Sequence, residues 1–189
     1  MSEFGYTVDT SGLDKHIQEF DRQLVGVLDR TARSSLNRLA EHMASHIDAG
    51  GPAPGEFSGS SRVGNRSGRL HDALFFGNEA NSSKIIFTTN GVEAIWIPNT
   101  TKVPYLRIQN DGGFVRHKGK MPFKLFRLAQ ETGIDNYRIM GAAALRDGGI
   151  TITAHPFIEP GTKEFESQSL PRLKQELDVD IVRTWNALQ

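Results

Sequence analysis

Apolar residues recur every three or four positions near the start of the chain. The series is Leu13, Ile17, Phe20, Leu24, Val27, Leu28, Ala32, Leu36, Leu39, Met43 and Ile47. This spacing places the side chains on one stripe of a helix and predicts a helix over residues 10–49. Ser11 is a suitable N-terminal cap, and Gly50-Gly51-Pro52 ends the pattern.

The expected length of this helix raises a question about its packing. A helix of roughly 37 residues is about 55 Å long at 1.5 Å per residue, whereas a small domain is about 30 Å across. Either the helix breaks near Gly26, or part of its apolar stripe packs on another chain. The pattern alone leaves both alternatives open.

A second helical pattern closes the chain. Leu170, Leu173, Leu177, Ile181, Trp185 and Leu188 recur at helical spacing, which predicts a C-terminal helix within residues 161–189. Pro171 suits the first turn of such a helix. Before it, residues 155–161 are expected to form an extended link, because a residue that precedes a proline avoids the helical conformation.

Strand-forming patterns dominate the middle of the chain. Residues 84–89 and 92–97 are rich in β-branched and aromatic residues and flank Asn90-Gly91, a strong hairpin signal. A second pair of strands is predicted over 137–144 and 149–153, around Arg146-Asp147-Gly148. Residues 122–132 are predicted to form a short helix ending at Gly133.

Two segments are expected to be loops. Residues 50–68 are rich in Gly, Pro and Ser and predict a flexible loop, and residues 98–121 are polar and predict an extended loop. Residues 69–76 are compatible with one or two turns of helix or with a strand. The expected fold is a single α+β domain over 1–189, with two long terminal helices on a small antiparallel sheet in region 69–160.

Composition adds that the charge is unevenly distributed. The 189 residues include 22 basic and 22 acidic side chains and no cysteine. Residues 1–50 hold five basic and eight acidic residues, residues 51–140 hold twelve and seven, and residues 141–189 hold five and seven. The basic excess of the middle part suits DNA or an acidic partner surface, or is ordinary surface charge. The missing cysteines exclude a disulfide scaffold, thiolate metal sites and a cysteine nucleophile.

Targeting and membrane signals are not expected. The first residues, Met1 to Phe4, lack the basic and apolar regions of a secretory signal. No apolar run approaches the roughly 18–20 residues that a membrane span needs.

The candidate catalytic patterns are incomplete. His42 and His46 lie four residues apart, a spacing that places two imidazoles on one helix face, but Met43 stands where a zincin has Glu and no third ligand is evident. Gly59 and Gly64 have P-loop spacing without the lysine and hydroxyl that must follow, and no nucleophile elbow occurs. We expect no enzyme activity, metal or cofactor.

Basic residues beside aromatic residues indicate a candidate interface with nucleic acid or with another protein. The region 107–127 mixes cations with Phe114 and Phe123, as surfaces that bind nucleic acid do. The same composition suits the rim of a surface that docks another protein. The residues expected to face DNA or a partner are Arg62, Arg116, Lys118 and Lys120.

Three segments in a fixed order resemble a known family. They are Arg66-Ser67-Gly68-Arg69-Leu70-His71-Asp72-Ala73-Leu74, then Tyr105-Leu106-Arg107-Ile108-Gln109-Asn110-Asp111-Gly112-Gly113, and then His155-Pro156-Phe157-Ile158-Glu159-Pro160-Gly161. Their order, and their places relative to the terminal helices, are similar to those of bacteriophage tail-completion or neck proteins, which include the minor tail protein Z-like and virion-morphogenesis proteins. The chain departs from the family pattern at Leu106 and His155 and over 112–133, which leaves the subfamily open.

The resemblance implies a structural virion protein. Such proteins form a ring, commonly a hexamer, at the head–tail junction of a tailed phage, and DNA passes through the ring. Assembly in the host cytoplasm, contacts with connector, tail-terminator or tail-tube proteins, and no membrane are implied. A DNA-binding module using 107–127, or a metal-dependent enzyme using the two histidines, remains an alternative. The motif residues expected to have packing roles are Arg66, Gly68, Leu70, Tyr105, Ile108, Gly112, Pro156, Phe157 and Pro160.

Overall fold

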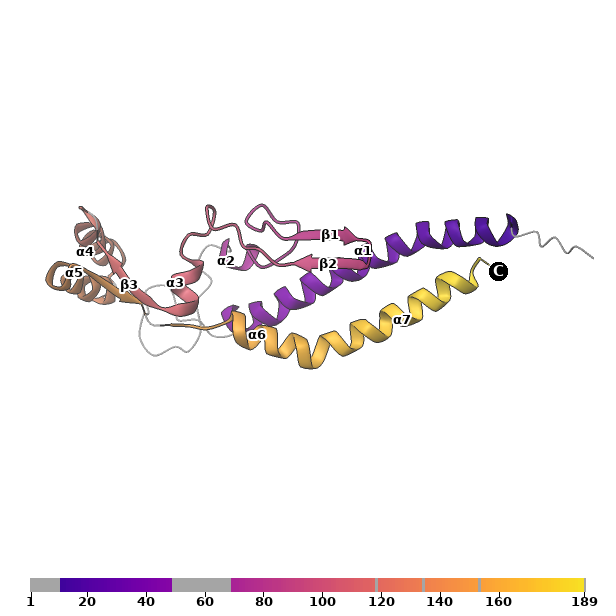
Figure 1. The fold of residues 1–189 in the computed structure, drawn as a ribbon. Coiled ribbons are helices and arrows are strands. Elements are labelled where there is room, and N and C mark those ends of the chain that lie inside the picture. The colour runs from indigo at the N-terminus through magenta and orange to yellow at the C-terminus, as the bar shows by residue number, and fades with distance from the viewer. Residues whose placement is uncertain (1–10, 49–68, 118, 134, 153, 189) are drawn as a thin grey trace, which may run out of the picture.

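The fold is an elongated α+β arrangement built around two long helical arms (Figure 1). A computed structural model describes residues 11–48, 69–117, 119–133, 135–152 and 154–188. The arms are joined near one of their ends, a β-hairpin lies along the first arm, and a small lobe of two helices and two strands projects beyond the joint. No helix within the described residues is long and apolar enough to cross a membrane.

The first arm is one continuous helix, α1 (Ser11–Asp48). The helix predicted from the apolar stripe is therefore confirmed, and the alternative of a break near Gly26 is wrong. Gly26 is tolerated there because it faces open surroundings: a Cβ at this position would meet only the Arg30 side chain, at 3.7 Å. The stripe is buried only from Val27 onward, and none of the residues from Gly12 to Gly26 is buried.

The second arm returns along α1 and consists of three helical segments in direct succession. They are α6 (Ile158–Glu164), the π-helical segment η1 (Phe165–Ser169) and α7 (Leu170–Asn186). The helix begins earlier than predicted, so the extended link predicted for 155–161 is limited to 155–157, and Pro160 lies in the first turn of α6, where a missing N–H is tolerated. The wider turn of η1 ends two residues before Pro171, whose ring and missing N–H disturb a regular helix.

The hairpin predicted around Asn90 is confirmed. Strands β1 (Lys84–Thr88) and β2 (Gly91–Ile95) are antiparallel, and Thr88 pairs with Gly91 so that Thr89 and Asn90 form the turn. The segment before it begins with a single helical turn, α2 (Arg69–Asp72), in agreement with the helical alternative for residues 69–76.

The second predicted strand pair is wrong in its partners. Residues 137–144 belong to a helix, α5 (Asp135–Asp147), and β4 (Gly149–Ile152) pairs instead with β3 (Gly113–Arg116). This helix packs closely against α4 (Met121–Thr132), because Gly141 has no side chain. A Cβ on Gly141 would lie 3.1 Å from the Phe126 ring. The α4 prediction is confirmed, and Gly133 ends this helix in the left-handed conformation.

The loop predicted over 98–121 is also wrong in part. It contains α3 (Leu106–Asp111) and the strand β3. Both are short, with six and four residues, so neither shows a clear helix or strand pattern in the sequence. The α+β class is confirmed, with two separate two-stranded sheets among the described residues. The loop predicted over 50–68 lies outside the described residues.

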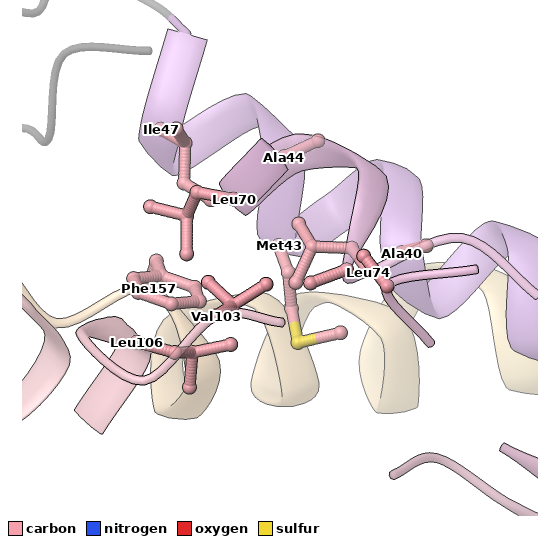
Figure 2. Packing of buried hydrophobic residues seen from close by; sticks show 11 residues of the cluster. Ala40, Met43, Ala44, Ile47, Leu70, Leu74, Val103, Leu106 and Phe157 are labelled. Carbon is pink, nitrogen blue, oxygen red and sulfur yellow. The ribbon is translucent and has the colours of Figure 1, made fainter. Parts of the chain in front are cut away.

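The hydrophobic core lies where the arms meet. Figure 2 shows α1 contributing Ala40, Met43, Ala44 and Ile47, which face residues from the segments before and after the hairpin and from the start of the second arm. The opposing residues include Leu70, Leu74, Val103, Leu106 and Phe157. Phe157, Met43 and Ile47 are among the largest fully buried side chains. This core fixes the joint, whereas the far halves of both arms lie outside it.

Candidate functional site

The three motif segments, which are far apart in the sequence, meet at this joint. Leu70 of the first segment, Leu106 of the second and Phe157 of the third belong to one buried cluster (Figure 2). Tyr105 and Ile158 are half-buried against it. The packing roles expected for Leu70, Tyr105 and Phe157 thus have a common location.

The second and third segments are also joined by hydrogen bonds. The backbone N–H groups of Phe157 and Ile158 donate to Oδ1 of Asn110, at 3.0 and 3.1 Å. The backbone N–H of His155 donates to the carbonyl oxygen of Gln109 at 2.9 Å. Asn110 satisfies two donors at the start of α6 that have no partner inside the helix, so it caps α6 from another element. Sequence reasoning missed Asn110, because its partners lie more than forty residues away.

Two glycines allow the backbone segments of the joint to approach each other. Gly112 has a φ of +71°, and a Cβ there would lie 2.7 Å from the backbone nitrogen of Ala154. Gly161 of α6 lies against α1, where a Cβ would be 2.7 Å from the Cα atom of Met43. Such contacts are closer than real Cβ atoms make, so only glycine fits without a shift of the backbone.

The remaining motif residues have less central positions. Ile108 lies within α3, and its side chain contacts Gly113 at the start of β3. Pro156 is exposed and precedes the helix start, and Pro160 is half-buried inside α6. Arg66 and Gly68 lie outside the described residues.

The two histidines examined as metal ligands take part in a polar cluster between the arms. Nε2 of His42 shares a hydrogen bond of 2.8 Å with Oγ of Ser169. Nε2 of His46 lies 3.1 Å from Oε1 of Glu164, and Nδ1 of His42 lies 3.4 Å from Oε2 of the same carboxylate. The cluster therefore links α1 to α6 and to the end of η1. No sequence pattern indicates this cluster, since the partners are 118 and 127 residues apart.

The order serine, histidine, carboxylate invites comparison with a hydrolase triad. In a triad the carboxylate accepts a hydrogen bond from the histidine that activates the serine. Here the carboxylate makes its hydrogen bond with the second histidine, His46, and its contact with His42 is longer. Among the described residues no group of three or more His, Asp or Glu side chains is arranged to hold a metal ion. The geometry fits a set of polar contacts that holds α1 against the second arm.

The lobe formed by β3, α4, α5 and β4 carries the candidate interface. Its three acidic residues are paired with arginines: Arg127 with Glu131, Arg138 with Asp135, and Arg146 with Asp147. The hydrogen bond from Arg146 lowers the pKa of Asp147, which keeps that carboxylate ionised and occupied.

Three cations of the lobe remain without an ion-pair partner among the described residues: Arg116, Lys120 and Lys124. Two exposed aromatic side chains, Phe114 and Phe123, belong to the same lobe. These three cations and two rings belong to one lobe, whereas Arg107, at the start of the region 107–127, pairs with Asp111 at 3.5 Å. Arg62 and Lys118 lie outside the described residues.

No family model, no curated protein and no solved structure matches this chain.

Proposed function

We propose that this chain is a structural virion protein of a tailed bacteriophage, a tail-completion or neck protein that forms a ring at the head–tail junction. One observation carries the proposal. The three segments that resemble the family meet in one joint, where Leu70, Leu106 and Phe157 are buried together. Segments that share a packing role are expected to recur together in a family that shares a fold.

The chemistry of the joint supports an assembly role. Its side chains are apolar or are engaged in hydrogen bonds that hold backbone segments together, as Asn110 does. The polar cluster of His42 and Glu164 serves the same purpose between the arms. A rigid joint with projecting arms and a projecting lobe (Figure 1) suits a subunit that contacts several neighbours at once.

The test uses the virus whose genome encodes the chain. A stop codon at Gln18 is expected to yield filled heads and separate tails, with joined particles restored when the full chain is supplied in trans. Mass spectrometry of purified wild-type particles should detect the chain at a few copies per particle. Normal joined particles from the stop mutant, or virions that lack the chain, would contradict the proposal.

A second candidate function is binding to duplex DNA. It is favoured by Arg116, Lys120 and Lys124, which have no ion-pair partner among the described residues and lie in one lobe with exposed aromatic rings. Affinity that rests on such contacts falls steeply with salt. A gel-shift titration with a duplex at several salt concentrations tests this function, and the variant Lys120→Glu/Lys124→Glu should lose the shift.

A further inference from the structure

The two ends of the molecule are less well packed than its middle. Between Gly12 and Gly26, α1 has no buried residue, and α7 has none after Leu173. The contact there is made by half-buried side chains, such as Trp185 against Phe20, with ring centroids 5.1 Å apart. At the opposite end, Pro122, Tyr137 and Ala144 are the buried apolar side chains among the described residues of the lobe.

Each of these ends exposes an ordered row of apolar side chains together with charge. On α1, Leu13, Ile17, Asp21 and Val25 follow each other at intervals of four, so they form one ridge of the helix, which we call the α1 ridge. Its apolar members are 55%, 42% and 51% exposed. Asp21 has no ion-pair partner among the described residues.

The matching row lies on α4. Lys120, Phe123, Lys124, Arg127 and Leu128 are spaced by three and four and occupy the outer side of the helix; we call them the α4 strip. Phe123 is the most exposed large hydrophobic side chain among the described residues, at 63%. Lys120 and Lys124 have no ion-pair partner within the described part of the chain.

We propose that the α4 strip of one copy docks on the α1 ridge of a second copy, head to tail. The occupant is argued from charge: an apolar ridge with an unpaired carboxylate faces an apolar strip with unpaired lysines. Residues 113–152 carry seven basic and three acidic residues, and residues 11–48 carry five and six. The two surfaces lie at opposite ends of one molecule, so they cannot meet within a chain (Figure 1).

An interface between two different surfaces has a consequence for assembly. Each copy that docks leaves its own ridge free for the next, so the contact closes into a ring or continues as a filament. This contact would join the subunits of the proposed ring and in that respect rests on the proposed function, but self-assembly of the purified chain tests it separately. It holds or fails with the isolated chain, whereas the proposed function fails only in the virus.

Mass photometry and light scattering of the purified full chain test the docking. We expect wild-type species of three or more copies, and a single copy for Phe123→Asp and for Ile17→Asp. A mixture of these two variants retains one intact strip and one intact ridge, so it should form a complex of two copies and nothing larger. Ile86→Asp, at an exposed position on β1, is the matched control and should assemble as the wild type does.

Charge reversal makes the test independent of apolar side chains. Lys124→Glu and Asp21→Lys should each weaken assembly by about tenfold or more, and the double variant should recover it. Circular dichroism of every variant establishes that the helices remain. A variant that still forms dimers by itself would indicate a symmetric contact and overturn the proposal. A wild-type chain that stays a single copy and binds duplex DNA through the α4 strip would overturn it in favour of DNA binding.

Discussion

The side chain of Asn110 caps the helix that begins after Phe157. Its Oδ1 atom accepts the backbone N–H of Phe157 at 3.0 Å and that of Ile158 at 3.1 Å. Helix N-termini leave backbone donors without partners, and the residue that normally satisfies them is the cap itself. Phe157 has no such side chain, so a residue from α3 supplies the acceptor.

Asn110→Ala is expected to lower the free energy of unfolding by about 1–2 kcal/mol, the usual cost of a lost helix cap. Asn110→Asp should retain most of the stability, because a carboxylate also accepts both bonds and suits the positive end of the helix dipole. Urea unfolding followed by circular dichroism measures both. If both variants lost the same free energy of unfolding, the helix cap would not be the way in which Asn110 stabilises the chain.

Gly161 and Gly26 provide a matched pair of substitutions. A Cβ on Gly161 would lie 2.7 Å from Cα and N of Met43, so Gly161→Ala should force the arms apart and cost about 1–3 kcal/mol. Gly26→Ala meets only a flexible arginine at 3.7 Å. It should stabilise the chain by about 0.5–1 kcal/mol, because alanine loses less entropy in a helix. Thermal and urea unfolding compare the pair, and a stabilised Gly161→Ala would contradict the close approach of α1 and α6.

A fall in pH is expected to weaken the side-chain contacts of Glu19 on α1. Hydrogen bonds from Arg22, and next from Gln23, lower the pKa of Glu19 below its ordinary value of 4.5. A lowered pKa in the folded state means that this stabilisation is present above pH 4.5 and is lost as the pH falls through the folded value.

The measurement is the carboxyl titration of Glu19 by NMR. Arg22→Ala should raise its pKa toward the ordinary value, whereas Arg33→Ala should leave it unchanged because Arg33 pairs with Asp29. A Glu19 midpoint that does not move in Arg22→Ala would refute the assignment.

Removal of metal ions is expected to leave the stability unchanged. Glu164 lies close to both His42 and His46 with its two oxygens, and the described residues contain no group arranged for a metal ion. The melting temperature should therefore be the same with EDTA and with added zinc. A zinc-dependent rise that disappears in His46→Ala would instead assign a metal site to the cluster.

Some elements of the fold have local sequence signals, and others depend on contacts with distant residues. The helix of α1 and the hairpin around Asn90 were predictable, because an apolar stripe and a turn signal are local properties. Residues 137–144 were assigned to a strand, yet they are helical. Gly141 lies against the ring of Phe126 in α4, and the sequence pattern of 137–144 does not show this contact.

The same distinction holds for the candidate sites. The cations and rings of 107–127 are visible as composition. Only the structure shows that Arg116, Lys120 and Lys124 have no ion-pair partner among the described residues, because each acid of the lobe pairs with an arginine. His42 and His46 were visible as a spacing, whereas the partner carboxylate of Glu164 comes from the other end of the chain.

By itself the sequence determined the two long helices, the hairpin and the uneven charge, because these depend on spacing and composition along the chain. Only the tertiary structure decided that the three motif segments share one joint, that Asn110 caps a distant helix, and that Gly161 lets the arms touch. The physical reason is range. Packing, capping and polar contacts satisfy groups that meet in space, and such partners are 47 residues apart for Asn110 and Phe157 and 127 apart for His42 and Ser169.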